Sequence, residues 1–349
     1  MKFTKYIKKK IFYLIYLVLI TFFLCESIVR TLPGTIPPDL INYLSQEAVN
    51  DVFNKRGFLQ NDKEGIYHYR PFQKLRYRSH INIDENGFRN SEYNQKNIDI
   101  VILGDSIVFA RDSKKDLGDL FRIEGNSVLN LGMGGYAPQH YRDVYKKYVI
   151  DKKIPHNKVL VNIFVGNDFG DSKSYPWRLE PKGSGNPNYP WLVNLFFGAF
   201  EIYDNSKVFK KKIDESKYRI SLPYGEIGLL QLWWNGDPSN EEWNKVNQAL
   251  DDIVIMADKA SAEVIFVIIP SPVSVYGVNL HSDFKHFVDY QNRIIKKFKN
   301  EFNNINIVDP TKDLALAINN KFLYTTEADC HFNEHGITVL HSIIKSNLK

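Results

Sequence analysis

Short apolar runs rich in Ile and Val recur along the chain from residue 98 onward. The five runs cover residues 98–105, 127–132, 158–166, 262–270 and 305–309. Most are continuous rather than alternating, which is typical of a strand buried on both faces of a sheet. Apolar positions at helical spacing follow along residues 243–257, 284–302 and 337–348. Strands that alternate with helices predict a parallel five-stranded sheet with helices on both of its faces.

The longest apolar run lies near the N-terminus, at residues 11–25, and follows a cluster of lysines. With the next few residues it reaches the length of about 20 that a membrane-spanning helix needs. Two interpretations stay open: an uncleaved signal anchor, or a signal peptide whose best cleavage site is Cys25-x-Ser27. In both cases the preceding lysines place the N-terminus in the cytoplasm and the remaining chain outside it.

Three regions follow from these patterns. Residues 1–29 are the cytoplasmic lysines and the anchor, and residues 30–95 form an extracytoplasmic lead-in that is first proline-containing and then aromatic and basic. Residues 96–349 contain the alternating strands and helices. We expect the lead-in to hold short strands and not to be an independent domain.

A long segment, about residues 171–240, separates the third predicted strand from the fourth. It is too long for a bare connection, so we predict an insertion over one end of the sheet. Its sequence is Gly- and Pro-rich, which predicts irregular structure, and it carries Trp177, Trp191, Trp233 and Trp234. Two interpretations stay open, a lid or substrate wall and an aromatic cluster that packs on itself.

The positive net charge does not indicate a nucleic-acid-binding face. The formal net charge is +5, and five lysines without an acid fall within the first ten residues, so the remainder is near neutral. Hydrophobic residues make up 44% of the 349 positions, enough for a sizeable core. Cys25 lies in the apolar run and Cys330 is alone in the exported part, so no intramolecular disulfide framework is available there.

Polar and glycine residues gather where the predicted strands end. Gly104-Asp105-Ser106 closes the first strand, Asn130 to Gly135 follow the second, and Gly166-Asn167-Asp168 closes the third. Asp329-Cys330-His331 comes after the last strand. Ligands of open α/β sheets bind beyond the carboxyl ends of the strands, so we expect these groups to converge on one edge.

These residue types match the parts of an acyl-transfer site. Ser106 is the candidate nucleophile, His331 the candidate base that takes its proton, and Asp329 the acid that orients the imidazole. The backbone N–H groups of Ser106 and Gly135 and the side-chain amide of Asn167 are candidate oxyanion donors, with Gly134 as the alternative to Gly135. Asp105 and Asp168 are interpreted as hydrogen-bond acceptors that fix their loops.

A competing motif overlaps the acid–histidine pair. His331, Glu334 and His335 spell H-x-x-E-H, a zinc-peptidase spacing that requires both histidines on one helical face. Asn333-Glu334 is typical of a helix start, which places His331 in the preceding loop. The D-x-H interpretation is therefore favoured, and no metal or organic cofactor is expected.

In this combination of motifs the sequence resembles the SGNH (GDSL-type) hydrolases. The family's Ser, Gly, Asn and His correspond to Ser106, Gly135, Asn167 and His331, and the stretch DENGFRN resembles one that precedes the GDS strand in a membrane-anchored, envelope-facing branch. The resemblance implies a flavodoxin-like three-layer α/β/α fold and ester chemistry on acyl groups of sugars or lipids. One departure is Ala110, which stands where the family usually has glycine.

The expected protein is thus a membrane-tethered serine esterase that acts outside the cytoplasm on an acyl group of an envelope polysaccharide or other glycan, and the acyl group is expected to be acetyl. Three alternatives stay open. The same residues could serve an O-acyltransferase, the fold could persist in a catalytically silent glycan-binding or assembly protein, or the substrate could be a lipid ester or thioester.

Overall fold

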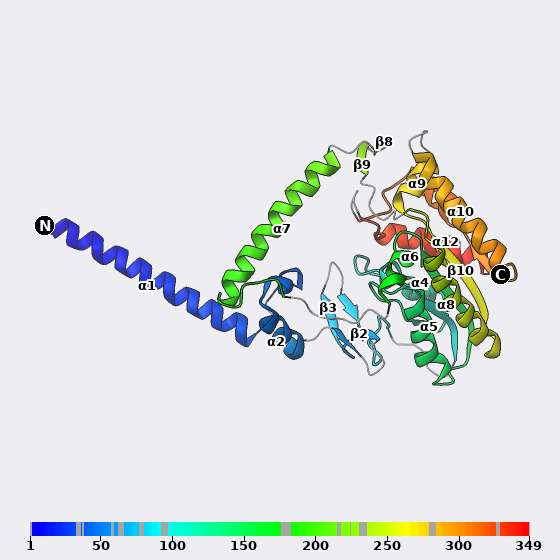
Figure 1. The fold of residues 1–349 in the computed structure, drawn as a ribbon, viewed down its shortest axis with the longest axis horizontal. Helices are drawn as coiled ribbons and strands as arrows, with labels where there is room; N and C mark the ends of the chain where they lie inside the picture. The colour runs from blue at the N-terminus through cyan, green and yellow to red at the C-terminus, as the bar shows by residue number, and fades with distance from the viewer. Residues whose placement is uncertain are drawn as a thin grey trace. The chain divides into compact units, whose positions relative to one another are not determined.

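In a computed structural model of the chain, the predicted alternation of strands and helices forms a single parallel sheet with helices on both faces (Figure 1). The structure describes residues 2–32, 36, 38–56, 59–61, 66–76, 80–91, 97–175, 183–214, 218–223, 225–229, 236–278, 284–325 and 329–348. These residues form two compact units: Met1–Phe58 with Leu179–Lys211, and Leu59–Arg178 with Lys212–Lys349. The second unit contains the sheet.

The strands of the sheet are β5 (Ile98–Leu103), β6 (Val128–Asn130), β7 (His156–Phe164), β10 (Glu263–Ile269) and β11 (Asn306–Val308). Their spatial order is β11-β10-β7-β5-β6, and every neighbouring pair is parallel. Counted along the chain, this is the order 2-1-3-4-5 of the flavodoxin-like folds. The predicted fold class is therefore confirmed.

Helices cover the sheet on both faces because each strand is apolar on both. On one face, Ile102, Leu160 and Val267 share a buried cluster with residues of α4 and α12, among them Phe121 and Leu340. The helices of this unit are α3 (Ser106–Phe109), α4 (Leu117–Ile123), α5 (Pro138–Tyr145), η3 (Lys146–Ile150), α6 (Asp168–Asp171), η4 (Ser172–Ser174), α8 (Asn240–Lys259), α9 (Pro272–Val278), α10 (Lys285–Glu301), α11 (Thr311–Ala317) and α12 (Glu334–Asn347).

The opposite face is packed largely by aromatic rings. Phe266 of β10 contacts Phe298 and Phe302 at the end of α10, with ring centroids 6.4 and 5.0 Å away. Phe298 in turn contacts Trp243 of α8, at 4.9 Å. The helical faces predicted from sequence spacing around residues 243 and 298 are the faces that the sheet buries.

Part of the lead-in belongs to the sheet-containing unit and has the short strands that were predicted. β1 (Leu59–Asn61) pairs with β2 (Tyr67–Tyr69), and β3 (Lys74–Arg76) pairs with β4 (His80–Asn82), each antiparallel. The turn after them includes Gly87, whose φ of +89° favours glycine.

The other unit holds the N-terminal helix α1 (Lys2–Thr31), the short helix η2 (Pro38–Tyr43), α2 (Gln46–Arg56) and most of α7 (Trp191–Asp214). Residues 10–31 of α1 are long and apolar enough to span a membrane. A small buried cluster, which includes Leu44, Val49 and Trp191, joins η2, α2 and α7.

The predicted irregular structure of residues 171–240 was wrong for a large part of that segment. Residues 191–214 form the 24-residue helix α7, and β8 (Tyr218–Leu222) and β9 (Gly225–Leu229) form an antiparallel hairpin. Glycine and proline lie before α7 and around the hairpin, whereas α7 itself contains only Gly198, which is why the segment as a whole looked irregular. Trp177, Trp233 and Trp234 lie outside the described residues.

Candidate active site

Ser106 is the first residue of α3, directly after β5 ends at Leu103. The Asp105 side chain caps this helix by accepting a hydrogen bond from the Ile107 N–H at 2.9 Å. The turn is tight, because a Cβ on Gly104 would come within 2.3 Å of the Val108 side chain. Glycine and aspartate thus place the serine hydroxyl at the carboxyl edge of the sheet.

His331 and Asp329 meet Ser106 although 225 residues separate the serine from the histidine. His331 Nε2 lies 2.9 Å from Ser106 Oγ, and His331 Nδ1 lies 2.5 Å from Asp329 Oδ1. Because an ionised carboxylate only accepts, the imidazole must carry its proton on Nδ1, which leaves Nε2 to accept the serine proton. The structure therefore brings together the three residues that were predicted as nucleophile, base and orienting acid.

Asp329 is held in its charged form. Burial alone would raise its pKa, but the hydrogen bonds from His331 and Thr325 outweigh burial and hold the pKa of Asp329 well below its usual range. Thr325 Oγ1 donates to Asp329 Oδ2 at 2.8 Å, and the His331 backbone N–H donates to Oδ1 at 3.1 Å. These bonds fix the carboxylate in the orientation that the imidazole needs.

The turn from Met133 to Tyr136 passes beside the serine. Tyr136 N donates to Met133 O at 3.2 Å, and Gly135 has a φ of +77°. A Cβ on Gly134 would lie 3.8 Å from Ser106 Cβ, so the turn approaches the nucleophile closely. The candidate donor Gly135 therefore lies in a glycine-dependent turn next to Ser106, as its proposed role requires.

Asn167, the other candidate oxyanion donor, precedes α6 at the end of β7. Its amide nitrogen donates to Asp171 Oδ2 at 2.9 Å, and its side chain is near enough to Asp105 to lower the pKa of that carboxyl group. The amide thus lies close to the residue that caps the nucleophile's helix, although in this structure it donates to Asp171. Its donation to an oxyanion stays a prediction.

Two buried carboxyl groups lie at the same edge. Asp168 Oδ2 accepts hydrogen bonds from Tyr141 Oη at 2.9 Å and from Phe164 N at 3.0 Å, so it fixes the loop after β7 as interpreted. Burial raises the pKa of Asp105 to about 6, and burial together with the nearby Asp105 raises that of Asp168 well above its usual value. Perturbed acids of this kind are typical of functional sites.

The stretch DENGFRN stands out in the sequence, but its pattern does not indicate the role of Arg89. Arg89 is buried, and its guanidinium donates to four backbone carbonyls, those of Phe109, Ala110, Ser113 and Lys114. Its Nε lies 3.2 Å from Asp116 Oδ2. Arg89 therefore fastens the C-terminal end of α3, the helix that begins with Ser106.

The contact also accounts for the departure at Ala110. This residue ends α3 with a φ of +49°, a left-handed conformation that glycine adopts more easily than alanine. Its carbonyl accepts from Arg89 at 2.6 Å. Alanine adopts this left-handed turn at a conformational cost of about 1 kcal/mol, and Arg89 hydrogen-bonds its carbonyl.

Two further lead-in residues that sequence reasoning missed hold the neighbouring loop. Asn90 accepts a hydrogen bond from Asn130 N at 2.8 Å and donates to Asn130 O at 2.9 Å, at the end of β6. Tyr67 Oη donates to Gly134 O at 2.6 Å. Of these two residues, only Asn90 could have been found from the sequence, because it directly follows Gly87-Phe88-Arg89.

The zinc interpretation does not fit the geometry. The Asn333 side chain caps α12 by accepting from Gly336 N at 3.0 Å, so His331 precedes the helix, as predicted, and His335 lies within its first turn. Asp329, Cys330 and His331 do place ligand-type atoms within 4.8 Å of one another. However, burial raises the pKa of the Cys330 thiol far above neutrality, and a thiol must be deprotonated to bind a metal.

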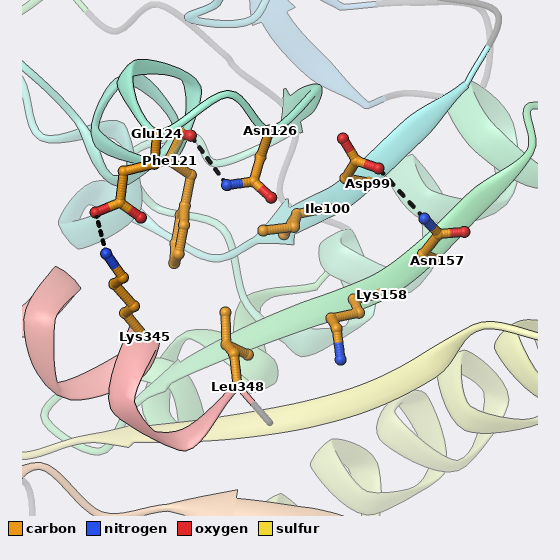
Figure 2. A pocket seen from close by; sticks show the side chains of 9 residues that line it. All are labelled: Asp99, Ile100, Phe121, Glu124, Asn126, Asn157, Lys158, Lys345 and Leu348. Atoms are coloured by element: carbon orange, nitrogen blue, oxygen red, sulfur yellow. Dashed lines mark hydrogen bonds and ion pairs between the residues drawn. The ribbon is translucent and has the colours of Figure 1, made fainter.

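Cavities open at both edges of the sheet. One of about 450 Å³ lies at the carboxyl edge, beside Asn167, and is lined by Gly166, Tyr290 and the charged side chains of Lys173 and Asp237 among others. Another of about 300 Å³ lies at the amino edge, between β5, β7 and the end of α12 (Figure 2). The first is lined by Gly166, the chain neighbour of Asn167, but neither cavity is lined by a residue predicted for the site.

Sheet order and residue placement now agree with what the resemblance implied. Ser106, Gly135 and Asn167 follow the first, second and third strands of the 2-1-3-4-5 sheet, and His331 precedes the last helix. The fold is a flavodoxin-like three-layer α/β/α fold, as the resemblance implied.

No family model matches the chain, and no curated protein matches it. Among solved structures it is similar to a GDSL-like lipase from Bacteroides thetaiotaomicron, with 13% identity, a TM-score of 0.35 and coverage of 72% of this chain and 87% of that one. It is also similar to a catalytic mutant of an acetylxylan esterase from Geobacillus stearothermophilus, with 13% identity, a TM-score of 0.40 and coverage of 72% and 93%.

Proposed function

We propose that the chain is a membrane-anchored SGNH-type serine esterase that removes an ester-linked acetyl group from an envelope polysaccharide or other glycan. The observation that carries this proposal is the continuous chain of contacts from Ser106 Oγ through His331 to Asp329, at 2.9 and 2.5 Å. A serine in this arrangement is activated for attack on a carbonyl carbon.

Because the imidazole proton of His331 is on Nδ1, His331 Nε2 can take the proton of Ser106, and the reaction steps follow from this. Ser106 Oγ bonds to the ester carbonyl carbon while its proton passes to His331 Nε2, and the carbonyl π electrons move to oxygen. That oxyanion is stabilised by N–H donors, for which Ser106, Gly135 and Asn167 are the proposed sources. The C–O bond to the sugar then breaks, and His331 returns the proton to the departing sugar oxygen.

A second half-reaction restores the enzyme. Water attacks the acyl-Ser106 carbon, His331 Nε2 takes one water proton, and the proton is delivered to Ser106 Oγ as acetate leaves. Throughout, the negative charge of Asp329 stabilises the imidazolium that forms in each half. These steps need no metal or organic cofactor.

A polar cavity lined by Gly166, the chain neighbour of Asn167, supports a sugar substrate over a long acyl chain. Its lining includes the charged side chains of Lys173, Asp237 and Glu242, together with the Tyr290 ring. An acyl groove would instead be lined mainly by apolar side chains. The exposed apolar residues of α1 and the lysines in its first ten residues support an anchor with the site outside the cytoplasm.

The test is acetate release by the full-length protein in detergent, from 4-nitrophenyl acetate and from O-acetylated oligosaccharides. We expect release by the wild type and by Lys345→Ala, a matched variant at the amino edge, but not by Ser106→Ala or His331→Ala. Transfer of acetyl to an added oligosaccharide in place of release would indicate the O-acyltransferase alternative. Folded wild-type protein that neither releases nor transfers acetyl would contradict the proposal.

A further inference from the structure

Helix α7 presents four aromatic side chains to solvent along its first half. Phe196, Phe197, Phe200 and Tyr203 are 69%, 57%, 58% and 55% exposed. Phe196, Phe200 and Tyr203 are spaced as i, i+4 and i+7, so they form one stripe, and Phe197 lies beside it. Exposed aromatic groups in this density mark a surface that contacts something other than water.

The other face of α7 is already buried within its own unit. Trp191, Asn194 and Leu195 are all less than a tenth exposed. A Cβ on Gly198 would come within 2.4 Å of the Tyr43 ring, so the helix packs tightly against η2. The aromatic stripe therefore points away from the protein interior of this unit.

The start of α7 is attached to the end of the apolar segment of α1. Glu26 Oε1 accepts a hydrogen bond from Trp191 N at 3.0 Å, and Glu26 Oε2 accepts one from Leu192 N at 2.9 Å. A carboxylate at this position satisfies the free N–H groups of the first helical turn, so α1 caps α7. Arg30, which pairs with Glu26 at 2.6 Å, also lies over the Trp191 ring.

The contact between Glu26 and the start of α7 determines how deep α7 lies in a membrane that α1 spans. Glu26 directly follows the apolar run of residues 11–25, so it lies where α1 leaves the hydrocarbon region if α1 spans the membrane. At a rise of about 1.5 Å per residue, Tyr203 is only about 18 Å along the helix from Trp191. A helix that starts at this level and lies along the surface keeps all four aromatic groups at the interface.

From this geometry we infer that α7 is an interfacial helix whose stripe of Phe196, Phe197, Phe200 and Tyr203 rests on the outer leaflet of the membrane that α1 spans. The inference rests on the anchor in the proposed function. Aromatic side chains concentrate at membrane interfaces, and amphipathic helices there bury their apolar face to a depth of about 5–10 Å.

The charges along α7 agree with a lipid surface. Lys207 lies one turn beyond Tyr203 on the same stripe, with its Nζ 4.1 Å from the centre of the Tyr203 ring. Lys210, Lys211 and Lys212 follow in the sequence. Basic groups at the end of an interfacial helix attract anionic headgroups, whereas a second copy of this helix would bring the same positive charges together.

The test places a polarity-sensitive fluorophore at single cysteines of the full-length protein in vesicles of phosphatidylethanolamine and phosphatidylglycerol. The background is Cys25→Ser, because Cys25 is exposed in α1. Phe200→Cys reports on the stripe, and Asn205→Cys, an exposed position on the opposite face of α7, is the matched control. Nitroxide-labelled lipids serve as the quencher.

We expect blue-shifted emission and strong quenching at position 200, and neither at position 205. Equal, weak quenching at both positions would overturn the inference, and so would self-quenching at position 200 that rises with protein density, because that indicates a second copy. A label at Leu17→Cys separates the two proposals: if it too is unquenched, the anchor has failed rather than α7.

Discussion

Both edges of the parallel sheet carry acidic side chains. Those at the amino edge have hydrogen-bond or ion-pair partners, whereas Asp105 and Asp168 at the carboxyl edge are buried. At the amino edge, Asp99 accepts a hydrogen bond from Ser127 N at 2.7 Å. Glu124 pairs with Lys345 at 2.7 Å (Figure 2). At the carboxyl edge, Asp105 and Asp168 are buried, and one oxygen of each has no hydrogen-bond partner among the described residues.

The pKa directions follow from this contrast. The hydrogen bond from Lys345 lowers the pKa of Glu124, whereas burial raises the pKa of Asp105 and Asp168. Polar groups that serve only the fold find partners or water, and groups buried without partners cost stability. The buried acids that cost stability therefore lie at the carboxyl edge, near Ser106, as is typical of a functional site.

The largest effect in this comparison should come from Asp329→Asn. The amide cannot stabilise the imidazolium, and it favours the wrong imidazole tautomer, so kcat for ester hydrolysis should fall on the order of 10⁴-fold. Asp313→Asn, at an exposed acid of α11, is the matched control and should hydrolyse like the wild type. A loss of less than tenfold in Asp329→Asn would mean that the acid does not orient His331.

Removing the arginine that fastens α3 should have the next largest effect. Arg89→Ala leaves the buried Asp116 carboxylate and four carbonyls without their donor, so the free energy of unfolding should drop by about 3–5 kcal/mol. Denaturant titration of the full-length protein in detergent measures it. Arg111→Ala, at a half-exposed arginine, should cost less than about 1 kcal/mol, and equal losses in both variants would refute the role of Arg89.

Much of this edge was predictable because its signals are local. The Ile- and Val-rich run before Ser106, the Asn333-Glu334 helix start and the Asp329-x-His331 spacing each lie within a few residues, so pattern reasoning found the strands and the candidate triad. The partners of Arg89 could not be predicted, since it contacts carbonyls 20 to 25 residues away. The spacing of apolar residues in a sequence does not indicate which side chains will contact backbone carbonyls.

The helix α7 was missed for a different reason. Gly183, Gly185 and the prolines near them dominate the composition of the segment before it, and the cap of α7 comes from Glu26, 165 residues earlier in the chain. A helix whose N-terminal cap is supplied by a distant residue lacks the usual start signal. The tryptophans of the segment left a lid and a self-packing aromatic cluster open, because the sequence does not say which face of a helix is already covered.

A smaller effect should appear in the pH dependence of stability. The folded pKa of Asp105, about 6, exceeds the unfolded value of about 3.9, so the folded state holds a proton that the unfolded chain has released. The contribution of Asp105 to stability is therefore fully present below about pH 4 and is lost as pH rises to about 6.

Asp105→Asn keeps an acceptor for Ile107 N but cannot ionise. We expect it to match the wild type near pH 4 and to exceed it by on the order of 2 kcal/mol at pH 7. Thermal unfolding at the two pH values measures the difference. A variant that is equally destabilised at both would show that the carboxyl group is needed for its geometry alone.

The smallest effect is expected at the amino edge. Lys345→Ala removes an exposed ion pair with Glu124, so it should leave both stability and ester hydrolysis nearly unchanged. Steady-state kinetics and thermal unfolding check both. A tenfold loss of activity would mean that the amino edge also takes part in catalysis, which would contradict the comparison of the two edges.

The most direct test of the central claim is labelling of the folded, full-length protein with a serine-directed phosphonate, followed by mass spectrometry of its peptides. We predict a single adduct on Ser106, lost in Ser106→Ala and in His331→Ala and kept in Lys345→Ala. Absence of an adduct in folded wild-type protein, or an adduct on another serine, would contradict the assignment of Ser106 as an activated nucleophile.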